Sequence, residues 1–118
     1  MRMTNAQIFD SIPVLAQAKE EKGLLGYALA VNLRKLSTEA QEYSKKRDEL
    51  LEKHGHQAEE PGRYALTPAA VAAFNAELQP YAELVIEVPV MQVTPEVFYG
   101  GGLTSAQMYT LSWMVKEG

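Results

Sequence analysis

One uninterrupted stretch, residues 24–53, limits what this chain can fold into more than any other. Its apolar and near-apolar positions follow one another in steps of four and three residues, the spacing that places side chains on one side of an α-helix. The positions of this stripe are Leu29, Leu33, Leu36, Ala40, Tyr43, Arg47 and Leu50. No proline or glycine interrupts the run after Gly26, and His54 with Gly55 supplies a stop signal. The spacing therefore predicts one long helix over residues 24–53.

Such a helix is too long for a compact chain of this size. At about 1.5 Å per residue, some thirty residues extend over roughly 45 Å. A compact chain of 118 residues has a diameter of about 35 Å, from a radius of gyration of about 13–14 Å. The helix is therefore expected to overhang its domain and to need a partner, which favours a homo-oligomer, a dimer or higher. We include Trp113 in the predicted interface because aromatic residues are enriched at interfaces. The predicted interface residues are Leu29, Leu33, Leu36, Ala40, Tyr43, Leu50 and Trp113.

Composition narrows the class of protein. A length of 118 residues indicates a single domain, and a net charge of −4 makes a nucleic-acid partner unexpected. The chain has no cysteine, which excludes disulfides, thiolate nucleophiles and cysteine metal ligands. No apolar run approaches the roughly 18–20 residues that span a bilayer, and the N-terminus lacks the layout of a signal peptide. We expect a cytoplasmic protein with no membrane contact.

Helix boundaries are marked by caps and prolines. Residues 4–7 and 104–107 both read Thr-x-Ala-Gln, a capping box that predicts a helix start at each place. The first of these helices runs to about Ala18, with a kink or break at Pro13, and forms an αα-hairpin with the long helix. A third helix is expected to begin after Thr67 and to end at Pro80.

The clearest strand is at residues 84–88, where apolar side chains alternate. Residues 64–66 are its expected pairing partner. Together these elements predict a mainly helical α+β fold: an αα-hairpin with one long helix, two further helices and a small antiparallel ribbon of two or three strands. The single domain is divided into a helical hairpin (1–54), a loop (55–63) and a small region of strands and helices (64–118).

A series of short motifs follows the chain in a characteristic order. Thr-Asn-x-Gln-Ile (4–8) precedes Leu-Leu-Glu-Lys-x-Gly (50–55) and Gly-x-Tyr-x-Leu (62–66). Phe-Asn-x-Glu-Leu (74–78), an acidic strand (83–88) and Leu-Thr-x-Ala-Gln (103–107) come later. This order resembles small phage and prophage proteins of no assigned function. The resemblance implies a viral origin and brings no catalytic residues with it; Pro13 and the glycines at 100–102 have no match in that pattern.

A glycine-rich segment directly precedes the last predicted helix. Free backbone amides and a helix dipole can hold a phosphate at such a place. The segment lacks the lysine of a P-loop, and a flexible linker with an N-cap is favoured over a phosphate site. If a small anionic ligand binds to this chain, its predicted site consists of Tyr99, Gly100, Gly101, Gly102, Thr104 and Ser105.

The only two histidines, His54 and His56, stand at the end of the long helix, near Glu52, Glu59 and Glu60. Imidazole and carboxylate groups suit zinc. However, a histidine near a helix C-terminus is also favoured by the helix dipole, so we expect no metal and no cofactor. The chain also lacks a nucleophile motif such as Gly-x-Ser-x-Gly. We therefore expect a protein that is not an enzyme.

The expected function is that of a non-enzymatic interaction protein of phage type, working as a homo-oligomer in the cytoplasm of the bacterial host. From the resemblance we expect a host-directed factor that counters a bacterial defence by occupying a host protein. One alternative is sequestration of a small anionic, nucleotide-like signal at the glycine segment. Another is a structural role in virion assembly. The sequence does not separate the three.

Overall fold

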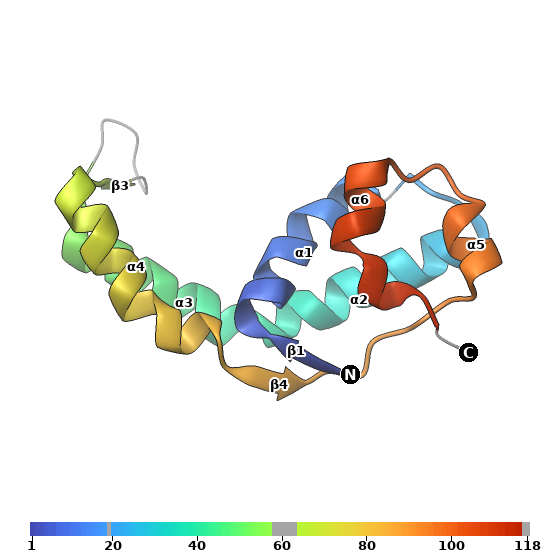
Figure 1. Cartoon of the computed structure of the whole chain (residues 1–118), viewed down its shortest axis with the longest axis horizontal. Coiled ribbons are helices and arrows are strands. Elements are labelled where there is room, and N and C mark those ends of the chain that lie inside the picture. Colours follow the sequence, from blue (N-terminus) through green and yellow to red (C-terminus); the bar gives the residue numbers. More distant parts are fainter. Residues whose placement is uncertain (19, 58–63, 117–118) are drawn as a thin grey trace.

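The computed structural model of the chain describes residues 1–18, 20–57 and 64–116, and these form a body and an arm (Figure 1). The molecule measures 47 × 29 × 23 Å with a radius of gyration of 16.4 Å, so it is more elongated than a compact chain of this length. The helices of the body are α1 (Asn5–Gln17), α2 (Gly23–Glu39), α5 (Pro95–Tyr99), α6 (Ser105–Thr110) and the 3₁₀ helix η1 (Ser112–Met114). Those of the arm are α3 (Gln41–His54) and α4 (Pro68–Ala82).

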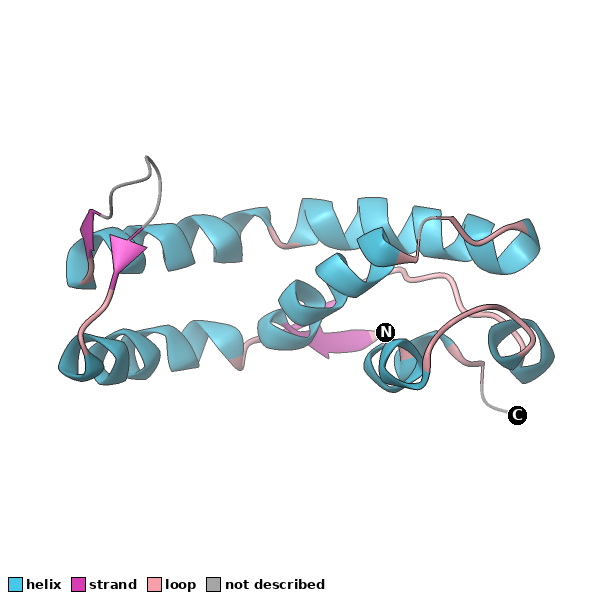
Figure 2. Ribbon diagram, turned by 90° about the horizontal axis from the view of Figure 1, so that it is seen from above, coloured by secondary structure: helices cyan, strands magenta, loops and turns pink. Residues whose placement is uncertain are grey.

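The long helix predicted over residues 24–53 is present as two helices, α2 and α3, that follow one another end to end (Figure 2). They are separated at Ala40, whose ψ of −8° differs from the value of about −42° that continues an α-helix. The Thr38 hydroxyl donates to the Arg34 carbonyl at 3.1 Å, a bond to the preceding turn that often bends helices. The prediction of one uninterrupted helix is therefore wrong at this position, whereas α3 ends at His54, one residue beyond the predicted end at residue 53.

Helix α3 is the half of this pair that extends beyond the body, and α4 of the same chain covers it (Figure 1). Leu50 on α3 and Phe74 on α4 are both buried. Lys53 Nζ on α3 donates to Glu77 Oε1 on α4 at 2.9 Å. The overhanging helix thus has the partner that its apolar stripe requires, and this partner lies within the single chain.

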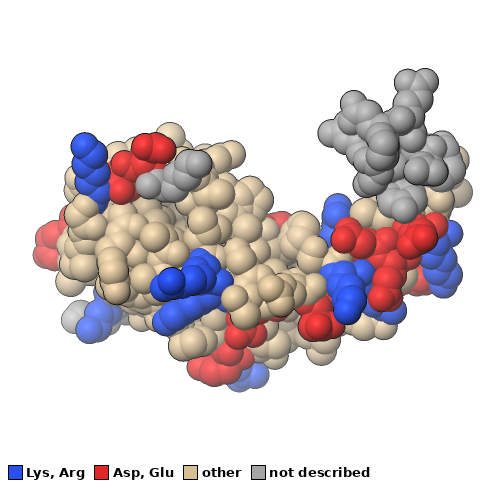
Figure 3. Space-filling view, turned by 180° about the vertical axis from the view of Figure 1, so that it is seen from behind, with Lys and Arg blue, Asp and Glu red and all other residues tan. Residues whose placement is uncertain are grey.

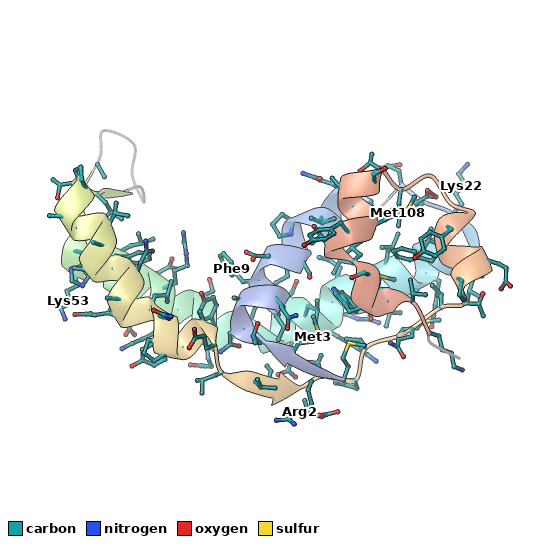
Figure 4. All side chains as sticks on the ribbon, in the orientation of Figure 1. Arg2, Met3, Phe9, Lys22, Lys53 and Met108 are labelled. Carbon is teal, nitrogen blue, oxygen red and sulfur yellow. The ribbon has the colours of Figure 1, made fainter. Side chains whose placement is uncertain are left out.

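Arg47 joins the arm to the body. Its guanidinium carbon lies 5.3 Å from the ring centre of Phe9 on α1 and 5.9 Å from that of Phe74 on α4. Phe9 extends from α1 toward the arm (Figure 4) and meets Tyr43 edge to face, with the ring centres 5.5 Å apart. Burial raises the pKa of the Tyr43 phenol. An arginine suits a position of the apolar stripe here because its charge faces aromatic rings.

Side-chain caps define the helix starts that the sequence predicts. The Thr4 hydroxyl accepts from the Gln7 amide at 3.1 Å, and Gln7 Oε1 accepts from the Thr4 amide at 2.9 Å. Thr104 and Gln107 form the same pair of bonds, at 3.2 and 2.9 Å. Both capping boxes are therefore confirmed.

Prolines interrupt the helices less than the sequence predicts. α1 continues past Pro13 to Gln17 without a break. α4 continues past Pro80 to Ala82, so the prediction that Pro80 ends this helix is wrong. A proline in the last turn removes only one backbone hydrogen bond, and Pro80 is exposed, so its ring needs no space in the core.

The strand predicted at residues 84–88 is present as β4 (Val85–Glu87), and it pairs with the start of the chain. Its antiparallel partner is β1 (Arg2–Thr4), with Met3 opposite Ile86. Met3 is buried, so the N-terminal residues contribute to the core. Three residues are too few to show the alternation that identifies a strand in a sequence.

The predicted pairing of residues 64–66 with residues 84–88 is wrong. The short strand β3 (Tyr64–Ala65) pairs with β2 (His56–Gln57) at the tip of the arm. α4 lies between β3 and β4 in the chain, and its fifteen residues hold their ends about 22 Å apart. The predicted loop at 55–63 therefore begins with a strand; residues 58–63 lie outside the described residues.

The main core lies in the body, where α1 and α2 form the predicted αα-hairpin. Its largest fully buried side chains include Phe98, Ile8, Leu15, Leu29, Leu36, Leu111 and Met114. Among the described residues, no helix has the length and apolar character needed to cross a membrane. With six α-helices and two small antiparallel strand pairs in the described part of the chain, the mainly helical α+β prediction is confirmed.

Candidate functional site

The glycine-rich segment predicted to hold an anion packs against the start of α2. The Gly102 amide donates to the Glu21 carboxylate. A Cβ atom added to Gly102 would lie 2.6 Å from Glu21 Oε1, and one added to Gly101 would lie 2.3 Å from Leu25 Cδ2. A larger residue at either position would therefore displace the end of the Glu21 or Leu25 side chain. A carboxylate of the protein itself thus occupies the place expected for a phosphate.

The other residues of this predicted site are also engaged or point away. The Thr104 hydroxyl and amide are both used in the capping box of α6. Ser105 is the first residue of that helix and is exposed. Tyr99 is 60% exposed and meets Phe98 edge to face. With Glu21 as the nearest charge, this geometry does not favour sequestration of an anion at the glycine segment.

Most of the predicted interface residues fill the core of the single chain. The buried ones are Leu29, Leu36, Ala40, Tyr43 and Leu50. Leu33 is half-buried and packs against the same core. Because the helices of the chain already cover this stripe, it belongs to the core of one copy. An oligomer would have to use a different surface.

The histidine cluster is only partly described. His54 Nε2 lies 3.2 Å from Glu77 Oε2, whereas the side chain of His56, and Glu59 and Glu60, lie outside what the structure describes. Within the described residues, no group of three or more potential metal ligands comes together. The geometry links His54 to α4 and strengthens the contact between the two helices of the arm.

Glu77 is expected to make the stability of the arm depend on pH. The hydrogen bond from Lys53, and then the close approach of His54 Nε2, lower the pKa of this carboxyl below its usual value of 4.5. The folded chain therefore binds a proton at Glu77 less readily than the unfolded chain. Its stabilising effect is complete above the unfolded pKa and is lost as the pH falls through the lowered folded pKa.

Urea denaturation between pH 6 and pH 3 tests this expectation. Glu77→Gln should lower the unfolding midpoint at pH 6, and the difference from the wild type should shrink toward pH 3. Glu20→Gln, at an exposed position of the turn before α2, is the matched control and should leave the midpoint unchanged. An equal effect of Glu77→Gln at both pH values would contradict the assignment.

Two surfaces were not identified from the sequence. One is a cleft of about 640 Å³ between α1 and the C-terminal segment, lined by Gln7, Asp10, Ser11, Tyr109, Thr110, Ser112 and Trp113. Its only sequence signal is a pair of aromatic residues four positions apart, Tyr109 on α6 and Trp113 on η1. The Trp113 indole N–H donates to the buried Ser11 Oγ at 3.1 Å, so the ring is held inside one chain.

The other surface is the outer face of α4, which the arm leaves uncovered. It consists of Ala69, Ala72, Ala73 and Ala76, all of which are exposed. Its sequence signal is a helix that is apolar nearly all round, including the side that does not face α3.

No family model matches the chain, and neither a curated protein nor a solved structure shows a match to it.

Proposed function

We propose that this chain is a non-enzymatic interaction protein that works as a homodimer, with two copies meeting through the outer face of α4. The observation that supports this is a mismatch between the composition of α4 and its burial. α4 is apolar nearly all round, yet only Phe74 among its fifteen residues is buried in the single chain. A helix that is hydrophobic on every side is normally covered on every side.

The distribution of charge over the arm supports the same surface. Eight of the fourteen residues of α3 are charged, and the arm seen from behind carries a mixture of both signs (Figure 3). α4 has one charged residue, Glu77, which faces Lys53 and His54 on α3. The outer face of α4 therefore lacks the charged groups that normally cover a solvated helix.

A second copy is the occupant that best fits this face. Alanines allow two helix axes to approach to about 8 Å, the lower end of the usual packing range. In an antiparallel pair with a two-fold axis at Ala76, Ala69 of one copy lies opposite Glu83 of the other. The carboxylate at the end of each helix then approaches the N-terminal turn of its partner, where the helix dipole favours a negative charge. No like charges oppose one another.

Light scattering during size exclusion is the test, over a range of protein concentrations. The wild type should have twice the 13.1 kDa mass of one chain. Ala76→Glu should give a single-chain mass, because it places two carboxylates against each other at the axis. Ala30→Glu, at an exposed alanine of α2, is the matched control and should remain dimeric.

Circular dichroism should show the same helix content in all three proteins. A wild type of single-chain mass at about 100 µM, or an Ala76→Glu variant that still dimerises as tightly, would contradict the proposal. An assembly larger than a dimer would instead favour the structural role in virions. Such an assembly needs a contact in addition to the two-fold α4 pair.

The proposed setting of this dimer comes from the resemblance to small phage and prophage proteins. It supports a host-directed factor that counters a defence in the bacterial cytoplasm by occupying a host protein. The test is co-expression of the wild type, or of Ala76→Glu, in a bacterium that carries a phage defence. Restored phage growth with the wild type alone would support this role, and equal phage growth with the wild type and with no protein would contradict it.

A further inference from the structure

The cleft between α1 and the C-terminal segment combines aromatic rings with one negative charge. Its volume of about 640 Å³ falls within the range of roughly 300–1,000 Å³ that small-molecule sites occupy. Asp10 is the one formally charged residue in its lining. Among the described residues, Asp10 forms no ion pair with a lysine or arginine. The cleft thus holds a carboxylate that has no direct cationic partner within the described residues.

Tyr109 is the most exposed of the large hydrophobic side chains of the described residues, at 85%. It projects from α6 at the edge of the cleft. An aromatic side chain so far from the core contributes little to folding, since burial is the main source of its stabilising effect. Its ring is therefore free to contact a ligand that enters the cleft.

Trp113, unlike the exposed Tyr109, is held in place by a hydrogen bond within the protein. Its indole N–H donates to Ser11 Oγ at 3.1 Å, and Ser11 is only 2% exposed. The one polar atom of the indole is thus satisfied inside the protein, and this bond fixes the ring in the cleft wall. What Trp113 offers to a ligand is the π surface of its ring, which is half-buried and needs no further hydrogen bond.

From these three residues we propose that the cleft binds an organic cation, a guanidinium or an ammonium group. The rings of Tyr109 and Trp113 provide π surfaces that attract a cation, and Asp10 provides the counter-charge. A guanidinium fits best because it can stack on a ring while it donates two parallel hydrogen bonds to a carboxylate. Thr110 and Ser112 add hydroxyl acceptors at the same rim. The source of the cation is an arginine side chain of a partner polypeptide or a free polyamine.

The fluorescence of Trp113 provides a direct readout, because it is the only tryptophan in the chain. The probes are N-acetyl-arginine amide, spermidine, and glucose as a neutral ligand of similar size. We expect a saturable change in emission with the cationic probes and none with glucose. Tighter binding of the arginine amide than of spermidine would identify a polypeptide side chain as the source. The reverse order would identify a free polyamine, and either order supports a cation site.

Two variants test the assigned groups. Asp10→Asn and Tyr109→Ala should each weaken binding by about fivefold or more, the effect of losing a contact of about 1 kcal/mol. Both positions are exposed, so the fold should persist, as circular dichroism would show. The matched controls, Asp48→Asn and Tyr99→Ala, replace an exposed aspartate of α3 and an exposed tyrosine of α5 and should bind like the wild type.

The proposal is overturned if no cationic probe changes the emission of Trp113 saturably, or if glucose binds equally well. It is also overturned if Asp10→Asn binds the cations as tightly as the wild type does. This site does not depend on the α4 face. The fluorescence titration can be repeated on the Ala76→Glu variant, which separates a failure of the cation site from a failure of the dimer.

Discussion

Replacing Phe98 by alanine is expected to lower the free energy of unfolding by about 3–5 kcal/mol. Phe98 is completely buried in the main core, on the short helix α5 that packs against α2. Removing the ring takes away its burial and leaves a cavity that the surrounding helices fill only in part. Since domains of this size are stable by roughly 5–15 kcal/mol, this single change should remove a large part of the total.

The neighbouring residue provides the control for this prediction. Tyr99 is 60% exposed and meets the Phe98 ring edge to face at 5.2 Å between centres. Tyr99→Ala should lower the free energy of unfolding by only about 0.5–1.5 kcal/mol, the value of one aromatic contact. Urea denaturation followed by circular dichroism measures both variants. Equal losses for the two variants would show that α5 is not anchored through Phe98.

The second large effect is expected from Asn32→Ala, a loss of about 2–4 kcal/mol in the free energy of unfolding. Asn32 is completely buried on α2. Its Nδ2 donates to the Met91 carbonyl at 2.9 Å, and its Oδ1 accepts from the Met91 amide at 2.7 Å. One side chain thus satisfies both backbone groups of a residue that has no strand partner. Lys35 Nζ donates to the Pro89 carbonyl at 2.7 Å and holds the same segment.

The alanine variant leaves a partly buried donor and acceptor without partners, which is why its effect exceeds that of an ordinary hydrogen bond. Asn75→Ala, at an exposed position of α4, is the matched control and should change stability by no more than about 0.5 kcal/mol. Hydrogen exchange gives a second readout: the Met91 amide should exchange faster in Asn32→Ala. A normal exchange rate there would rule out the assigned bonds.

Local features of this protein follow from the sequence alone. The starts of α1 and α6 are determined by capping boxes that extend over four residues, Thr4 to Gln7 and Thr104 to Gln107. The end of α3 lies at His54, where the His54–Gly55 pair predicts a helix stop. The apolar stripe correctly identified which side of α2 and α3 is buried. In each case the interacting groups are at most a few residues apart, so a short window of sequence contains all the necessary information.

The functional surfaces depend on tertiary contacts that no short window contains. Asp10 and Trp113 come together from opposite ends of the chain, and the Gly102 amide meets Glu21, 81 residues away. The sequence pattern at the glycine segment is compatible with an anion site. In the folded chain, however, the Glu21 carboxylate lies against this segment.

The sequence by itself therefore determined where α1, α4 and α6 begin, their caps, and which side of α2 and α3 is buried, because hydrogen bonds and side-chain periodicity act over three or four residues. Only the tertiary structure decided which strand pairs with β4, which helix covers α3 and which faces remain exposed. Several helices and strands of the chain have similar apolar surfaces and free backbone groups, so each of them could pack with more than one other element. The choice among them depends on the lengths and directions of the elements that lie between, as α4 shows by keeping β3 away from β4.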